Sequence, residues 1–342
     1  MIYRSKAPLR IGLAGGGTDV SPYADEYGGA ILNVTINLYA YASVKLRSDD
    51  NIIIIAQDRK ETIELKKSNV LPIDGKLDLA KGVYNRIIKE FKLEPFAFEL
   101  LTYVDAPPGS GLGSSSTLVV AILGVFTEIF KLPLGEYDIA HLAYRIERED
   151  LAMAGGRQDQ YAATFGGVNF MEFYKDNKVI VNPLRIKRTH LYELENNLLL
   201  FNTSTSRLSS EIIQKQSENV KQKNIVSIEA MHQLKEQSRM MKDAMLKGEL
   251  SKIGEILHYG FEQKKKMAKG ITNDSIDEIY ETALKAGATG GKISGAGGGG
   301  FMIFYAPYNN RFNVIEALAP FGGTICPYQF VDKGMVSWTN YY

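Results

Sequence analysis

The sequence predicts an α+β protein of two domains, and three observations support this. The chain has 342 residues, more than one hydrophobic core usually organises. Strand-like and helix-like patterns are mixed in its first half, whereas the pattern becomes mainly helical from about residue 209. We therefore expect an N-terminal α/β domain over residues 1–205 and a C-terminal domain over residues 206–342.

The expected elements follow from hydrophobic periodicity. Alternating apolar residues predict strands, and apolar residues three and four positions apart predict helices. The predicted strands are 33–47, 52–57, 96–104, 166–174 and 198–202, with 301–305 in the second domain. The predicted helices are 79–91, 117–130 and 134–154, followed in the second domain by 209–246, 250–267 and 275–286.

The composition excludes several classes of protein. With 40 basic and 39 acidic residues the net charge is +1, so no basic excess indicates nucleic acid or an anionic membrane as a partner. Cys326 is the only cysteine, which excludes an internal disulfide and a cysteine-based zinc site. The first residues lack the apolar core of a signal peptide. We expect a cytoplasmic protein, and its oligomeric state, monomer or homodimer, stays open.

Residues 107–116, which read PPGSGLGSSS, are the most informative stretch of the chain. Glycine permits positive φ and lets a ligand approach the backbone closely. The serines stand where the helix that follows should begin, so free N–H groups and the positive end of the helix dipole meet there. Such a site suits an anion, most often a phosphate.

Two further segments are rich in glycine: residues 7–19, which read APLRIGLAGGGTD, and residues 292–300, which read KISGAGGGG. Rival phosphate motifs do not fit. A Walker A loop needs Lys-Ser or Lys-Thr after its last glycine, and neither follows here. A dinucleotide fingerprint at Gly295, Gly297 and Gly300 should open a helix, but a strand-like FMIFY follows. A protein-kinase His-Arg-Asp loop is absent from the sequence.

The three glycine segments, in this order, resemble the three signature segments of the GHMP kinases, the family of galactokinase, homoserine kinase and mevalonate kinase. The resemblance spans most of the chain. It implies a ferredoxin-like C-terminal domain, a site in the cleft between the domains, ATP as phosphoryl donor and Mg²⁺ as cofactor. The residues it implies for ATP binding are Pro108, Gly109, Ser110, Gly111, Leu112, Gly113, Ser114, Ser115, Ser116 and Gly297.

The same resemblance implies the catalytic and metal-binding residues. Asp159, in GRQDQY, matches the aspartate that faces the acceptor hydroxyl. Arg10 matches the arginine of a Pro-x-Arg segment, where it would stabilise the transferring charge or balance Asp159. Glu147 fits the spacing of the magnesium-binding glutamate, with Glu149 as its local rival. Ser115 is the second expected metal ligand.

The first segment bears on the acceptor. Galactokinases carry Gly-Glu-His-x-Asp where this chain has GGGTD, so the aspartate, Asp19, persists while two bulky groups are gone. The stretch AGGGTDV followed by SPYADEYGG resembles the subgroup of D-glycero-D-manno-heptose 7-phosphate kinases. This implies transfer to the anomeric hydroxyl, giving the 1,7-bisphosphate for nucleotide-activated heptose and surface polysaccharide. Gly17, Thr18 and Asp19 are the expected sugar-binding residues.

A phosphorylated acceptor needs a second anion site, for which Arg207 and Arg157 are the candidates. Two other functions are open. One is another sugar kinase of the family, fucokinase-like or galactokinase-like. The other is a protein of this fold that binds sugar and nucleotide without turnover, against which the presence of Asp159, Glu147 and Ser115 argues.

Overall fold

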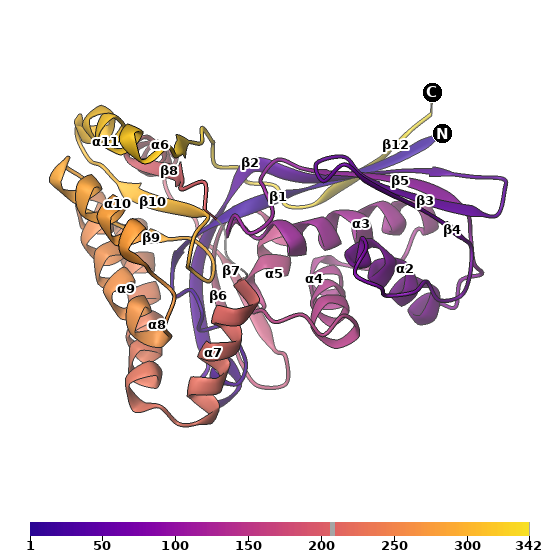
Figure 1. Cartoon of the computed structure of the whole chain (residues 1–342), viewed down its shortest axis with the longest axis horizontal. Coiled ribbons are helices and arrows are strands. Elements are labelled where there is room, and N and C mark those ends of the chain that lie inside the picture. The colour runs from indigo at the N-terminus through magenta and orange to yellow at the C-terminus, as the bar shows by residue number, and fades with distance from the viewer. Residues whose placement is uncertain (206–208, 342) are drawn as a thin grey trace.

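The computed structural model describes residues 1–205 and 209–341, and in these the chain forms two lobes, each built on its own sheet (Figure 1). The strands are β1 Ile2–Ala14, β2 Gly29–Leu46, β3 Asn51–Ala56, β4 Glu61–Lys66, β5 Phe98–Val104, β6 Val168–Phe173, β7 Val179–Pro183, β8 Leu198–Asn202, β9 Gly290–Ile293, β10 Phe301–Tyr305, β11 Thr324–Ile325 and β12 Val336–Asn340. The helices are α1 Tyr23–Tyr27, α2 Asp78–Phe91, α3 Ser114–Phe130, α4 Glu136–Arg145, α5 Gln158–Phe165, α6 Arg188–Asn197, α7 Ser209–Lys221, α8 Ile225–Lys247, α9 Ile253–Met267, α10 Asp274–Lys285 and α11 Asn310–Leu318.

The larger sheet has eight strands and is organised by the long strands β1 and β2. Its main path runs β12-β1-β2-β5-β3-β4, and β6 and β7 continue from β2. The first part of β2, residues 29–34, pairs with β6, whereas residues 40–46 pair with β5. Because its partners change along its length, β2 extends from the outer end of this lobe to the second lobe (Figure 1).

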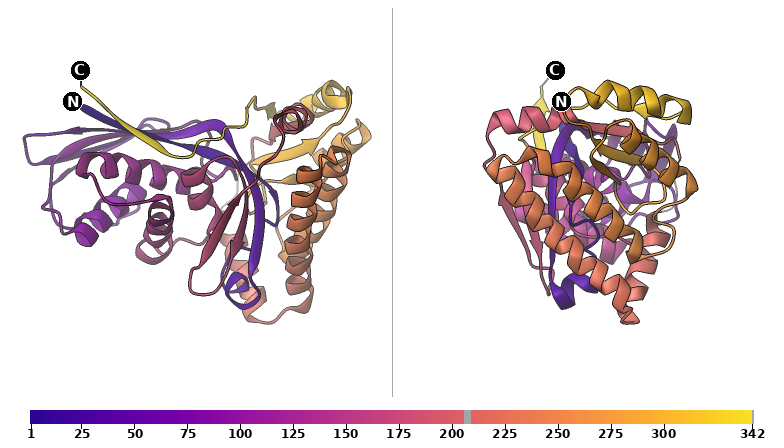
Figure 2. Two further views of the ribbon diagram at one scale, coloured as in Figure 1. Left: turned by 180° about the vertical axis from the view of Figure 1, so that it is seen from behind. Right: turned by 90° about the vertical axis from the view of Figure 1, so that its left-hand side faces the viewer.

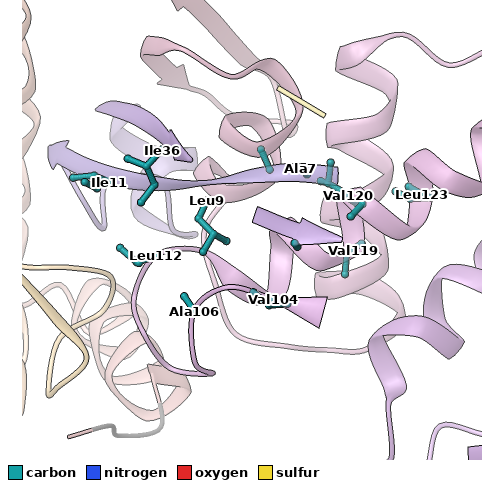
Figure 3. Close-up of a cluster of buried hydrophobic side chains, with 14 of the residues drawn as sticks. Ala7, Leu9, Ile11, Ile36, Val104, Ala106, Leu112, Val119, Val120 and Leu123 are labelled. Atoms are coloured by element: carbon teal, nitrogen blue, oxygen red, sulfur yellow. The ribbon is translucent and has the colours of Figure 1, made fainter. Parts of the chain in front are cut away.

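Helices α2, α3, α4 and α5 cover one face of the larger sheet (Figure 1). Helix α3 lies against the sheet and is apolar on nearly all sides, as expected for a helix enclosed by its neighbours. Val119, Val120 and Leu123 of α3 pack in the same cluster as Leu9 and Ile11 of β1 (Figure 3). The glycine loop that precedes α3 is therefore fixed at the end of a rigid core.

The smaller sheet has four antiparallel strands in the order β11-β8-β10-β9. Helices α9 and α10 pack against it, and α8 lies between α9 and the strands β1 and β2 of the larger sheet (Figures 1 and 2). Its core contains Phe201, Phe261, Ile293 and Phe304, all buried. Helix α9 also contacts β1, so the second lobe is packed against the first along the glycine-rich end of β1.

Two helices differ from the sequence expectation. The run 209–246 is two helices, because Lys223 has a φ of +55° and the Asn224 side chain accepts a hydrogen bond from the Ser227 N–H, which starts α8. The expected helix 134–154 starts as α4 and ends in a π-helical turn at Ile146–Asp150. Such π-turns often lie at functional sites, and this one carries Glu147.

The division into residues 1–205 and 206–342 stays a prediction. Two strands, β8 and β12, lie on one side of this boundary in the sequence but belong to the sheet of the other side. Strand β8 precedes residue 205 but belongs to the four-stranded sheet. Strand β12 follows it but pairs with β1 in the larger sheet, which places both described ends of the chain side by side (Figure 1).

Within residues 1–205 and 209–341, no helix is both long and apolar enough to cross a lipid bilayer.

Candidate active site

The glycine loop 107–116 turns into α3 by using the left-handed backbone. Gly109, Gly111 and Gly113 have φ values of +75°, +78° and +83°, which residues with a side chain rarely adopt. Leu112 points into the core beside Leu9 and is fully buried, so its side chain fixes the loop to the core (Figure 3). The first N–H groups of a 17-residue helix are thereby held at the loop, as anion binding requires.

The third glycine segment supports this loop from the second lobe. The Ser294 hydroxyl donates a hydrogen bond of 2.8 Å to the Gly111 carbonyl, and the Phe301 N–H donates one of 3.1 Å to the Ser110 carbonyl. A Cβ added at Gly111 would lie 2.7 Å from the Ser294 carbonyl oxygen, so only glycine permits this approach. Residues 107–116 and 292–300 are therefore in direct contact.

A cavity of about 650 Å³ lies between the two lobes at this loop. Eight of the residues expected at the phosphates line it: Pro108, Gly109, Ser110, Gly111, Gly113, Ser114, Ser115 and Ser116. The two that do not are Leu112, which faces the core, and Gly297, which packs against Ile271. In the third segment it is Gly295 and Ala296 that reach the cavity.

Arg10 and Asp159, from β1 and α5, meet in the wall of this cavity. The Arg10 guanidinium contacts the Asp159 Oδ1 atom through Nε at 2.7 Å and Nη2 at 2.6 Å. Its Nη1 donates to the Gly111 carbonyl at 2.5 Å, and its backbone N–H donates to the Leu112 carbonyl. One arginine therefore joins the expected catalytic carboxylate to the phosphate loop.

Asp19 holds the start of the helix that carries Asp159. Its Oδ2 atom accepts hydrogen bonds from the Arg157 and Gln158 N–H groups at 2.8 and 3.0 Å. A Cβ added at Gly156 would lie only 1.8 Å from that oxygen. Burial raises the pKa of the Asp19 carboxyl, while the Gln158 and Arg157 N–H groups oppose this shift. Asp19 lines the cavity, so it combines a fixed position with access to a ligand.

The remaining residues expected to bind sugar are placed differently. Gly17 lines the cavity. Thr18 does not, because its buried hydroxyl donates to the Gly15 and Ala30 carbonyls and so fixes the turn after β1. Arg207 lies outside the described residues.

Arg157 is engaged by the protein. Its guanidinium donates to the Tyr174 carbonyl, the Ser21 hydroxyl and the Asp25 carboxylate, and the side chain is buried. It does not line the 650 Å³ cavity but a neighbouring one of about 310 Å³. These contacts fix the segment before α5 and indicate a structural role.

Glu147 has one carboxylate oxygen without a hydrogen bond, close to Ser116 of the glycine loop. The side chain is fully buried, and its Oε2 atom accepts a hydrogen bond from Gln160 Nε2, which also donates to the Ser116 hydroxyl. Its Oε1 atom has no hydrogen-bond donor among the described residues, although Arg148 Nη1 lies 3.9 Å from it, and Glu147 does not line the 650 Å³ cavity. Glu149, the local rival, is exposed and paired with Arg145.

A single carboxylate oxygen near the Ser116 hydroxyl, with Ser115 in the cavity wall, fits Mg²⁺, which takes few protein ligands and completes its shell with phosphate and water. No cluster of three or more acidic, histidine or cysteine side chains that suits a metal occurs in the described part of the chain. These residues therefore suit a metal ion that binds together with a phosphate ligand, which supplies its other oxygen ligands.

Sequence reasoning missed several residues of the cavity. Lys264 of α9 lines it with a buried side chain, and Gln158 presents a buried Oε1 atom without a hydrogen-bond partner among the described residues. A signal for Lys264 was present, since Leu257 and Phe261, seven and three positions earlier, place it on the apolar face of its helix. A second cavity of about 320 Å³ adjoins the first and is mostly apolar. Residues shared by the two cavities are Asp58, Arg59, Leu79, Leu118, Leu151 and Met153.

Comparison with known proteins agrees with this geometry. The family model described as GHMP kinases N terminal domain matches residues 78–167, and that described as GHMP kinases C terminal matches residues 241–322. The chain is 46% identical over 335 residues to D-glycero-alpha-D-manno-heptose 7-phosphate kinase of Campylobacter jejuni, and the match covers 98% of each chain.

Solved structures give the same result. A D-glycero-D-manno-heptose 1-phosphate kinase from Bacteroides thetaiotaomicron is similar with a TM-score of 0.86 and 45% identity, over 99% of this chain and 100% of the other. Lactococcus lactis galactokinase, solved with galactose, has a TM-score of 0.80 over 98% of this chain and 95% of its own. At 21% identity that likeness concerns the fold alone.

Proposed function

The chain belongs to the GHMP kinase family, and from this premise we propose that it transfers the γ-phosphoryl group of ATP to the anomeric hydroxyl of D-glycero-D-manno-heptose 7-phosphate. The acceptor assignment rests on one observation, the 46% identity to the Campylobacter jejuni enzyme over 98% of both chains. The product would be the 1,7-bisphosphate, a precursor of nucleotide-activated heptose for surface polysaccharide. A cytoplasmic location, where ATP is available, is part of the proposal.

The cavity supports an arrangement of the two substrates along its length. The phosphates of ATP would lie on the N–H groups of residues 109–115, at the start of α3. The base would lie toward the apolar second cavity, near Leu79 and Leu118. The sugar would then occupy the end lined by Gly17, Asp19 and Asp159.

The chemistry of phosphoryl transfer assigns a task to each residue. Asp159 would receive the acceptor hydroxyl on Oδ2, because Arg10 already occupies Oδ1. Asp19 would hold sugar hydroxyls. Glu147 and Ser115 would hold Mg²⁺, which when bound supplies positive charge against the phosphate oxygens. The cavity wall from both lobes would exclude water, the competing acceptor.

The names of the two similar proteins suggest different acceptors, heptose 7-phosphate and heptose 1-phosphate. The experiment is a coupled ADP-release assay with ATP and Mg²⁺ over heptose 7-phosphate, heptose 1-phosphate, free heptose, fucose, galactose and mevalonate. We expect kcat/KM for heptose 7-phosphate to exceed the others at least about 100-fold, which is ~2.7 kcal/mol of discrimination.

The position of the new phosphate is read by ³¹P NMR of the product, where coupling to the anomeric proton marks transfer to C1. If only heptose 1-phosphate is phosphorylated, it replaces heptose 7-phosphate as the assigned acceptor. A preference for an unphosphorylated sugar would refute it and leave the sugar-kinase activity. ATP binding without ADP release on any acceptor would favour a binding protein without turnover.

A further inference from the structure

Lys264 is a buried cation that faces the active-site cavity. Its side chain is 3% exposed, and it lines the cavity from α9. An ammonium group has three N–H donors. In the described part of the chain Nζ makes one hydrogen bond, of 2.5 Å, to the Gly295 carbonyl. Two donors are thus left for a ligand.

The charge of Lys264 lacks a partner carboxylate among the described residues, although buried charges are normally paired. Burial and the nearby charge of Arg10 lower the pKa of Lys264 to about 8, and Asp19 opposes this shift. Lys292, on β9, is a second buried lysine, but its Nζ donates to the Gly12 carbonyl and it does not line the cavity. The third buried lysine of the described residues, Lys81, pairs with Asp74 and Asp78 away from the cavity, so Lys264 is the one available to a substrate.

The place of Lys264 identifies which part of a substrate it meets. Gly295, its hydrogen-bond partner, stacks directly on the phosphate loop, since a Cβ added there would lie 2.6 Å from Gly111 Cα. The Gly111 carbonyl accepts hydrogen bonds from Arg10 and from Ser294, the residue before Gly295. Lys264 is thus next to the contact that joins the loop to the Arg10–Asp159 pair, at the transfer end of the cavity.

We propose that Lys264 is a catalytic residue whose ammonium group donates hydrogen bonds to the phosphoryl group during transfer. The acceptor oxygen forms a bond to Pγ, and the bond from Pγ to the β–γ bridging oxygen breaks. ADP leaves with that electron pair, and the acceptor proton passes to Asp159. Negative charge spreads over the three equatorial oxygens of the phosphoryl group, where a fixed cation stabilises it most.

Arg10 does not fill this role alone. Its three contacting nitrogens are engaged by Asp159 Oδ1 and the Gly111 carbonyl, so it fixes the carboxylate and the loop. The first glycine segment leaves room for the lysine, because a Cβ added at Gly16 would already lie 3.7 Å from Lys264 Nζ. A larger side chain at residue 16 would displace the ammonium group.

The test compares Lys264→Met and Lys264→Arg with Lys265→Met in the full-length enzyme. Lys265 is the matched control, because its Nζ pairs with Glu262 and it does not line the cavity. We expect Lys264→Met to lower kcat about 100-fold or more, with the dissociation constant for ATP within threefold and the melting temperature not reduced. Lys264→Arg should recover part of kcat, and Lys265→Met should match the wild type.

The wild type supplies a readout that does not depend on folding of a variant. Arg10, Asp19 and Lys292 are the charged groups that face Lys264, and none of them removes its titration near pH 8. The kcat/KM should therefore fall as the pH rises through about 8, and this decline should be missing in Lys264→Met. A kcat within threefold of wild type, a loss confined to the acceptor KM, or a pH profile shared by wild type and variant would each overturn the proposal.

The inference rests on the kinase activity and not on the identity of the acceptor. The ratio of variant to wild type is measured with whichever sugar the wild type phosphorylates. A wrong acceptor assignment therefore appears in the wild type, and a wrong role for Lys264 appears only in the ratio.

Discussion

Arg10 and Asp159 are 149 positions apart, and both contacts that the Arg10 guanidinium makes with Asp159 go to the same carboxylate oxygen, Oδ1. The other oxygen, Oδ2, accepts no hydrogen bond from the described residues, although a Cβ added at Gly113 would lie 3.4 Å from it. The ion pair thus orients the carboxylate and leaves one oxygen beside Gly113, the residue that precedes α3.

Asp159→Asn should lower kcat by about 10²–10⁴-fold, the usual loss when a positioned proton acceptor is removed. The amide retains an oxygen for Arg10 but presents no anionic oxygen to the acceptor hydroxyl. The dissociation constant for ATP, measured by calorimetry, should stay near that of wild type. Asp243→Asn, on the exposed face of α8, is the control and should be fully active. Near-normal kcat in Asp159→Asn would remove this residue from the reaction.

Glu147→Gln should raise the Mg²⁺ concentration for half-maximal activity at least about tenfold, because it removes the charge of a hard oxygen ligand. Titration of activity with MgCl₂ at constant ATP measures this. The matched variant is Glu149→Gln, whose exposed carboxylate pairs with Arg145 and should not alter the metal requirement. The reverse result would assign the metal to Glu149.

Gly156→Ala should disturb the acceptor site through Asp19. The new Cβ would overlap the Asp19 Oδ2 atom, so Asp19 must move and lose its bonds to the start of α5. We expect a loss of about 1–3 kcal/mol in the free energy of unfolding and an acceptor KM raised about tenfold or more. Gly135→Ala is the control, since its φ is −86° and its Cβ would contact Asp138 at 3.6 Å. Equal effects of the two substitutions would show that Asp19 is not held by this contact.

Lys264→Met should be more stable than the wild type at pH 7, although less active. The folded-state pKa of Lys264, about 8, lies below its ordinary value of 10.5, so folding disfavours the charged form. That penalty is fully present below pH 8 and is relieved as the pH rises toward 10.5. We expect a gain in the free energy of unfolding of about 1 kcal/mol or more at pH 7, decreasing toward pH 10.

Chemical denaturation at pH 7, 8, 9 and 10 measures this difference. A variant less stable than the wild type at pH 7, or a difference that grows with pH, would contradict the expectation. It would show that the hydrogen bond to Gly295 outweighs the cost of burying the charge.

The sequence was sufficient for the elements whose signals are local. The glycine loop, α3 and the strands around residues 33–47 and 301–305 were predicted, because turn chemistry and periodicity are encoded within a few residues. The break between α7 and α8 was not, since Lys223 in a left-handed conformation has no composition signal. Strand β12 was also missed, because it forms only by pairing with β1.

In the site, too, local motifs were predictable and long-range contacts were not. The Arg10–Asp159 pair was expected from motifs. The position of Lys264 at the cavity was not expected, because it follows from the packing of α9 against the first glycine segment. For Arg157 the role in binding the acceptor phosphate stays a prediction. The sequence could not show that Asp25, Ser21 and Tyr174 already engage its guanidinium, because these contacts come from residues far apart in the chain.

The pairing of β12 with β1 has a consequence for how the protein is made. Strand β1 is synthesised before β12, so its outer edge stays without a partner until residues 336–340 have been added. An unpaired edge strand can join another chain. The newly made N-terminal lobe must therefore remain unfinished, and exposed to such misassembly, until the ribosome has completed the C-terminal lobe.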